Sequence, residues 1–202
     1  VNDLAETTAV NPLSARRDSE FIRGRVPMTK EEVRTVSVSK LGLKPYSICY
    51  DVGAGTGCVS IEMAVRVPKG KVYAIEKKEE AVSLLRENKK KFMADNMEII
   101  EGLAPEALEG LPAPTHVFIG GSSGNMREIL CSVFAKNPSA AVVINCIALE
   151  SVSQALSLAK ELGAGDEEVI QMSVSRASKV GSYTMMTGEN PITIISFTGK
   201  GV

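Results

Sequence analysis

Three glycines and two acids give the clearest sign of chemistry in this sequence. Gly53, Gly55 and Gly57 lie in the stretch YDVGAGTGCVSIEMA, between an apolar run and an amphipathic run. Because glycine is unfavourable in both strands and helices, this cluster indicates a turn where a ligand approaches the backbone closely. Asp51 comes just before the glycines. Glu76 follows about 20 residues later, where an acid can accept hydrogen bonds from ribose hydroxyls.

Asp51 indicates the charge of that ligand. A dinucleotide places its anionic pyrophosphate at the N–H groups of a helix terminus, and an acid there would repel it. The same acid suits an ammonium or sulfonium group, so the pattern favours S-adenosylmethionine over NAD. We expect Glu76 to face a solvated cleft. Two simpler interpretations stay open: structural glycines at a tight turn, and an ordinary strand-end carboxylate at Glu76.

Alternating strands and helices must position these residues. The runs SICYDV, KVYAIE, MEIIE, THVFIGG and AAVVINCI predict strands, and the segments between them predict helices. This alternation predicts a parallel sheet with helices on both faces. The later runs EEVIQMSVSRA and PITIISFTG also predict strands, and SKVGSYTMMTGEN suits a loop joining an antiparallel pair. We therefore expect an α/β sheet of seven mostly parallel strands with a terminal antiparallel pair.

Composition and the start of the chain set further limits. Residues 1–20 predict a flexible tail or linker and residues 21–202 one domain, in which Thr29 and Glu32 match a helix capping box. A net charge of −1 argues against nucleic acid or an anionic membrane as partner. No apolar run is long enough to span a membrane. The four cysteines fit no metal or redox spacing, so we expect buried, reduced thiols in a cytoplasmic protein without a metal site.

The motifs also resemble those of a known family. DVGAGTG and YAIE are similar to class I S-adenosylmethionine-dependent methyltransferases with a Rossmann-like fold. FIRGRVPMTKEEVR, EGLAPEAL, FIGGSSGNMREIL and NCIALES resemble one branch, the decarboxylating precorrin-6B C15-methyltransferases of cobalamin synthesis. Members of that branch occur alone or as the C-terminal half of a C5,15-methyltransferase. The resemblance runs from Phe21 to Gly199 and implies a homotetramer.

The resemblance implies a cofactor site for S-adenosylmethionine. The glycine loop would lie under its methionine and ribose, Glu76 would bind the ribose hydroxyls, and the main chain of Ala104 would meet the adenine. Leu103 replaces an acid that the family commonly has before that alanine. Thr29 matches a cofactor-contacting threonine. The expected cofactor-binding residues are Thr29, Asp51, Gly53, Ala54, Gly55, Thr56, Gly57, Glu76 and Ala104.

It also implies a tetrapyrrole site and a reaction. GGSSG departs from the usual family form GGSGG at Ser123, and its small residues would leave room for a flat macrocycle. The enzyme would methylate C15 and release the C12 acetate carboxyl of precorrin-6B or its cobalt form. No general base is identified. The expected substrate-binding residues are Met28, Gly120, Gly121, Ser122, Asn145 and Glu150.

Other partners and functions stay open at this point. Substrate carboxylates could meet basic residues expected near the cleft, namely Arg25, Lys30, Arg34, Arg176 and Lys179. A C5-methyltransferase domain or subunit is a further expected partner. The alternatives are a class I methyltransferase acting on RNA or protein, and a nucleotide-binding module without catalysis.

Overall fold

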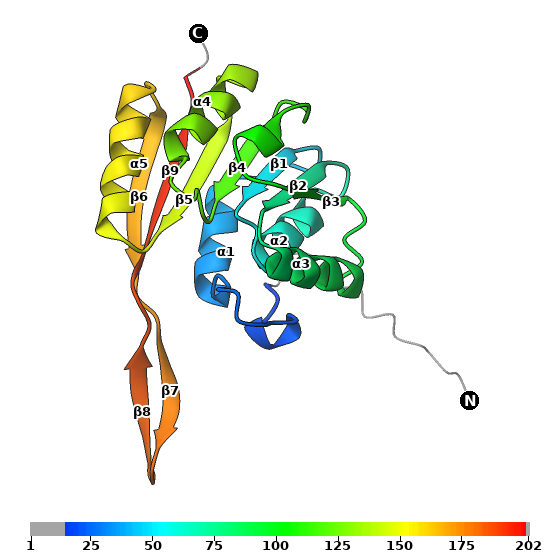
Figure 1. Ribbon diagram of the computed structural model, residues 1–202. Helices are drawn as coiled ribbons and strands as arrows, with labels where there is room; N and C mark the ends of the chain where they lie inside the picture. The colour runs from blue at the N-terminus through cyan, green and yellow to red at the C-terminus, as the bar shows by residue number, and fades with distance from the viewer. Residues whose placement is uncertain (1–14, 201–202) are drawn as a thin grey trace, which may run out of the picture.

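A seven-stranded sheet forms the centre of the structure, a computed structural model that describes residues 15–200 (Figure 1). The strand order is β3-β2-β1-β4-β5-β9-β6, and β9 runs antiparallel to both of its neighbours. This confirms the predicted sheet with its antiparallel pair. The strands are β1 (Ile48–Val52), β2 (Lys71–Glu76), β3 (Met97–Glu101), β4 (His116–Ile119), β5 (Ala141–Cys146), β6 (Gly165–Met172) and β9 (Ile192–Thr198).

Helices cover both faces of this sheet. On β1, Cys49 faces one apolar cluster, whereas Tyr50 and Val52 face the other, because successive side chains of a strand point to opposite faces. Both clusters are buried, which explains why the strands are continuous apolar runs. The first face carries α1 (Glu31–Lys40), α2 (Cys58–Arg66) and α3 (Glu79–Lys91); the second carries α4 (Met126–Lys136), α5 (Leu149–Glu161) and the short turn η2 (Glu106–Leu108).

The strand order reverses between β1 and β4. The chain builds outward through β2 and β3 and then returns to place β4 on the other side of β1. The loops after β1 and β4 therefore meet, and a Cβ atom on Gly53 would lie only 2.7 Å from the Gly121 carbonyl oxygen. Such a reversal is where open α/β sheets bind their ligands.

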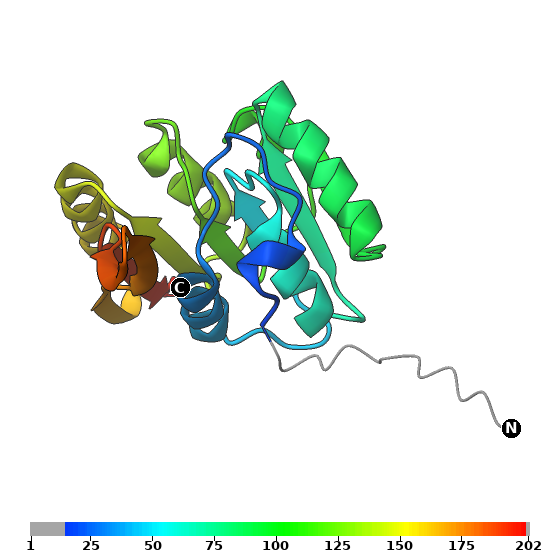
Figure 2. The ribbon, with the colours of Figure 1, turned by 90° about the horizontal axis from the view of Figure 1, so that it is seen from below.

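The segment before α1 packs on the domain instead of forming a solvated tail. Arg16 is buried, and its main-chain N–H donates to Glu62 Oε1 at 2.8 Å, just before the short turn η1 (Asp18–Glu20). Residues 21–30, which we call the strap, then run past the glycine loop to α1 (Figure 2). The tail prediction is thus wrong for residues 15–20, and residues 1–14 lie outside the described residues.

The connection between β6 and β9 is not an irregular loop. Strands β7 (Ser175–Val180) and β8 (Tyr183–Gly188) form a separate antiparallel ribbon, the arm, which extends away from the sheet (Figure 1). Most of its side chains are exposed on both faces, so its sequence lacks the alternation that identifies a half-buried strand.

Two smaller predictions are also wrong. The residue that caps the N-terminus of α1 is Lys30, not Thr29. The Thr29 carbonyl accepts a hydrogen bond from Arg34 further along that helix. Three cysteines are buried as expected, but Cys131 lies on the exposed side of α4.

Candidate active site

A cavity of about 780 Å³ lies where the strand order reverses. The loops after β1 and β4, the ends of β2 and β5, the strap and the foot of the arm all contribute to its wall. Its volume is within the range of small-molecule sites. The predicted residues that line it are Met28, Thr29, Asp51, Gly53, Ala54, Gly55, Thr56, Glu76, Gly120, Gly121, Ser122 and Asn145.

Three other predicted residues lie outside this wall. Gly57 precedes α2 with φ of 80°, and a Cβ atom there would lie 2.2 Å from Leu85 Cδ1, so this glycine permits helix packing. The Ala104 carbonyl accepts a hydrogen bond from Asn125 Nδ2 at 3.0 Å. Glu150 is exposed in the first turn of α5, where an acid suits the helix dipole. Ligand contacts of these three stay predictions.

The glycine loop is enclosed by the protein itself. Gly55 has φ of 56°, and a Cβ atom there would lie 3.4 Å from the Pro27 carbonyl oxygen in the strap. On the other side Gly53 faces the main chain of Gly121. Side chains at either position would be strained and would meet backbone atoms. These two glycines therefore let the strap and the β4 loop close around the cavity.

Glu76 is part of the framework of the loop. Its side chain is buried, and one carboxylate oxygen accepts the Gly55 N–H at 2.9 Å. The other oxygen accepts the N–H groups of Lys77 and Lys78 at 2.8 and 2.9 Å. The expectation of an acid facing a solvated cleft is thus wrong, because the end of β2 turns the carboxylate back onto its own backbone.

Asp51 has one oxygen left to bind a ligand. The Ser60 hydroxyl donates to Oδ2, whereas Oδ1 is buried without a hydrogen-bond partner among the described residues. Burial and, to a smaller extent, the Glu76 charge raise the pKa of Asp51 from 3.8 to about 7, against the opposing effect of the Ser60 hydrogen bonds. A buried acceptor of this kind requires a donor, and a cationic donor suits it best.

Asn145 offers the complementary group at the end of β5. Its Oδ1 accepts a hydrogen bond from the Ser37 hydroxyl at 3.0 Å. Its buried Nδ2 has no acceptor within the part of the chain that the structure describes. Two residues of the cavity wall thus hold a buried polar atom without a hydrogen-bond partner in the described chain, a carboxylate oxygen on β1 and an amide nitrogen on β5, two strands away in the sheet.

The sequence matches a known domain across this whole region. The sequence model of the family described as the precorrin methyltransferase domain matches residues 21–199 of this chain. The chain belongs to the precorrin methyltransferase family. Membership in this family of methyltransferases confirms the resemblance and the fold class predicted from the motifs.

Individual relatives support this family assignment. The chain is 40% identical over 173 residues to a probable cobalt-precorrin-6B C15-methyltransferase (decarboxylating) of Pyrobaculum calidifontis, covering 85% of this chain and 88% of the relative. It is 36% identical over 182 residues to the cobalt-precorrin-6B C15-methyltransferase (decarboxylating) of Salmonella typhimurium, covering 89% of this chain and 94% of the relative. The crystal structure of a precorrin-6Y C5,15-methyltransferase from Geobacter metallireducens superposes with a TM-score of 0.87 at 35% identity, covering 95% of this chain and all of that one.

Within this precorrin methyltransferase, the site has contributors that the motifs did not reveal. Val26 and Pro27 of the strap and Glu189 and Asn190 at the foot of the arm line the cavity. The pair at 189–190 lies directly before Pro191 and β9, a turn pattern that could have drawn attention to it. Val26 and Pro27 have no periodicity of their own, and the signal that could have identified them is the adjacent pair Met28 and Thr29 in the same motif.

The basic residues expected at the cleft divide into different environments. Lys30 lines the cavity, whereas Arg34 is fully buried. Arg176 forms ion pairs with Glu32 at 2.6 Å and Glu189 at 3.1 Å, so these acids already occupy its guanidinium. In the described residues, no cluster of three or more His, Cys, Asp or Glu side chains could hold a metal ion.

Replacing Glu76 with alanine should therefore affect folding as well as ligand binding. Three main-chain N–H groups lose their acceptor, and we expect the free energy of unfolding to fall by about 1–3 kcal/mol. Urea unfolding measures this change. Glu101→Ala is the matched control, because Glu101 pairs with Glu76 in the β2–β3 register but is exposed. Equal stability of both variants would contradict the framework role of Glu76.

Proposed function

We propose that this chain is an S-adenosylmethionine-dependent methyltransferase that methylates C15 and decarboxylates the C12 acetate of precorrin-6B or its cobalt form. The names of its relatives support the reaction and the substrate. The observation that carries the cofactor assignment is the unsatisfied oxygen of Asp51 beside a glycine loop. The sequence prediction of this activity agrees with these relatives.

The residues present fit S-adenosylmethionine. Asp51 would bind the positively charged amino group, and the loop from Gly53 to Gly55, which lines the cavity, would lie against the cofactor. Glu76 would use its remaining acceptor capacity for the ribose hydroxyls. The cofactor, when bound, supplies a methyl group activated by its sulfonium.

The protein's contribution to methyl transfer would be orientation and exclusion of water. The strap contributes Met28 and Thr29 to the cavity wall, and the loop after β4 contributes Gly120 and Gly121. Together these two segments would hold the tetrapyrrole carbon in line with the methyl group. The Asn145 amide would donate to an oxygen of the substrate. When carbon dioxide leaves the C12 acetate, the electron pair of the broken C–C bond would be taken up by the conjugated ring of the substrate itself.

We further propose a homotetramer that works in the cytoplasm. The arm supports association, because an isolated two-stranded ribbon is marginally stable in water and this one exposes Val180, Tyr183, Met185 and Met186. A C5-methyltransferase domain or subunit would act with it, as the name of the Geobacter relative suggests. No helix in the described residues is long and apolar enough to cross a membrane.

The experiment combines binding with turnover. S-adenosylhomocysteine should raise the melting temperature, since a ligand that binds only the folded state stabilises it, and NAD should not. The purified protein, given S-adenosylmethionine and precorrin-6B or its cobalt form, should add one methyl group and release one carbon dioxide, as measured by mass spectrometry. Methylation of RNA or protein, with neither tetrapyrrole converted, would overturn this proposal.

A further inference from the structure

Arg34 is a fully buried arginine whose guanidinium contacts the chain just before the strap and again near the end of the strap. It projects from α1, and its Nη1 donates to Asp18 Oδ1 at 3.0 Å and to the Thr29 carbonyl at 2.7 Å. Its Nη2 donates to the Arg16 carbonyl. One planar group therefore joins residues 16 and 18, which precede the strap, to Thr29 near its C-terminal end.

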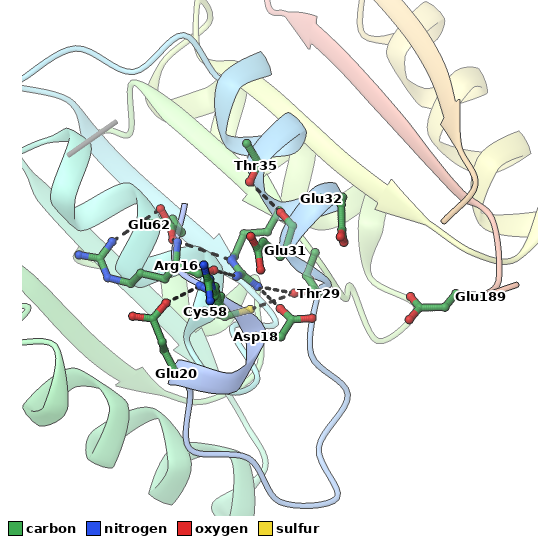
Figure 3. Close-up of polar contacts among 12 residues, drawn as sticks. Arg16, Asp18, Glu20, Thr29, Glu31, Glu32, Thr35, Cys58, Glu62 and Glu189 are labelled. Carbon is green, nitrogen blue, oxygen red and sulfur yellow. Dashed lines mark hydrogen bonds and ion pairs between the residues drawn. The ribbon is translucent and has the colours of Figure 1, made fainter. Parts of the chain in front are cut away.

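An aromatic ring and a carboxylate also lie against the Arg34 guanidinium. The guanidinium stacks over the Phe21 ring at 4.8 Å, and Nε lies 4.0 Å from Oε1 of Glu62 on α2. Glu62 also accepts the Arg16 N–H at 2.8 Å. Figure 3 shows Asp18, Thr29 and Glu62 converging on this point from three separate segments. Because α2 begins directly after the glycine loop, the network connects the strap to that loop.

The Arg34 contact at Thr29 adjoins the part of the strap that lies against the glycine loop, whereas Asn88 holds the other end of the strap at Ile22. The Pro27 carbonyl lies 3.4 Å from the Cβ position of Gly55, and Cys58 Sγ contacts the Thr29 carbonyl at 3.7 Å. Arg23, Gly24 and Arg25, at the middle of the strap, are exposed. A segment with an exposed middle is ordered mainly by what fixes its ends.

We propose that Arg34 is a positioning residue for the cofactor, holding residues 26–29 against the glycine loop by joining Thr29 to the residues that precede the strap. The inference rests on the proposed cofactor site. Arg34 touches neither cofactor nor substrate, since it is buried behind Thr29. It acts on the affinity and residence time of the cofactor, because a loosened strap leaves one wall of the cavity open.

The test compares Arg34→Lys with Arg66→Lys. Lysine keeps the charge beside Glu62 but cannot form the planar fork that reaches three acceptors. Arg66, one turn further along α2, pairs with the same Glu62 carboxylate at 2.7 Å and forms no hydrogen bond or ion pair with a strap residue within the described chain. Both variants thus weaken one buried ion network, and only Arg34→Lys removes a strap anchor.

Two measurements separate positioning from general stability. Calorimetry should give a dissociation constant for S-adenosylhomocysteine about tenfold higher in Arg34→Lys, a change of about 1.4 kcal/mol, and an unchanged value in Arg66→Lys. Trypsin cleavage after Arg25, with the ligand at saturation, should be several times faster in Arg34→Lys alone. In steady-state assays, KM for S-adenosylmethionine should rise while kcat stays near that of the wild type.

The outcomes distinguish this inference from the proposed function. If the wild type binds S-adenosylhomocysteine and Arg34→Lys binds it equally well with equal trypsin resistance, Arg34 is structural only and the inference is wrong. If the wild type does not bind it, the proposed cofactor site is wrong. Should Arg34→Lys fail to fold, Asp18→Ala decides by the same two measurements, because it removes one acceptor of Arg34 at a partly exposed position.

Discussion

Replacing Asp51 with asparagine is expected to weaken S-adenosylhomocysteine binding by about ten- to a hundredfold at pH 8. The ligand keeps the amino group of the cofactor, and hydrogen bonds to charged groups contribute about 1.5–3 kcal/mol. Asparagine preserves the shape of the side chain but cannot neutralise a cation. Calorimetry on both proteins measures the effect, and Asp95→Asn, which changes an exposed acid, serves as the control.

The pH dependence gives a second, sharper signature of the same residue. Because the pKa of Asp51 is raised to about 7, the unliganded carboxyl is increasingly protonated below neutral pH. Ligand affinity should therefore fall by up to about tenfold per pH unit below pH 7. This slope should be absent in Asp51→Asn, which lacks the titrating carboxyl. A wild-type affinity that is flat from pH 8 to pH 5.5 would contradict the assignment.

Stability without ligand should change with pH in the opposite direction. The folded state holds the Asp51 proton more tightly than the unfolded chain, whose carboxyl has a pKa near 3.8. The folded state therefore loses stability from this group as the pH rises from about 4 to about 7. Subtracting the unfolding free energies of Asp51→Asn from those of the wild type isolates this contribution. Asp51 therefore favours ligand binding at the pH values at which its own charge most destabilises the folded protein. Such a conflict between stability and binding is typical of functional groups.

The local chemistry of the site could be predicted from the sequence because the glycine loop is contiguous. Asp51, Gly53 and Gly55 lie together along the chain, and a strand followed by a helix fixes where such a loop must lie. The sequence predicts the place of Glu76 at the end of β2 but not the orientation of its side chain. The carboxylate turns toward three backbone donors, and hydrogen bonds of this kind depend on the path of the following loop rather than on strand pattern.

The strap and the arm show why the rest could not be predicted. Arg34 lies in a segment expected to border the cleft, yet it is fully buried, and Asp18 and Glu62 compensate its burial. Charge pairing across the fold overrides the usual preference of arginine for the surface. The arm lacks the alternation of a half-buried strand because nothing within the described chain covers either of its faces. Periodicity reports burial within one chain, so a strand outside the core gives no such signal.

Replacing Gly121 with leucine should block turnover while leaving the fold and cofactor binding intact. A Cβ atom on Gly121 meets nothing within 4 Å, and its backbone is not in the left-handed region, so a side chain is accommodated without strain. The residue lines the cavity beside Ser122. A leucine there would occupy space that the macrocycle needs. Forcing extra methylenes into filled space costs about 1–3 kcal/mol, so kcat/KM should fall by up to about a hundredfold.

The contrast between glycines makes this prediction specific to the substrate. Gly53 faces the Gly121 main chain at 2.7 Å from its Cβ position, so a side chain there should disturb the loop itself. Gly121→Ala is the graded control, because a single methyl group should reduce turnover only slightly. Product mass spectrometry gives kcat/KM for the tetrapyrrole, and calorimetry with S-adenosylhomocysteine gives cofactor affinity. Wild-type turnover in Gly121→Leu would show that the macrocycle lies elsewhere, whereas a parallel loss of cofactor affinity would assign this side of the cavity to the cofactor.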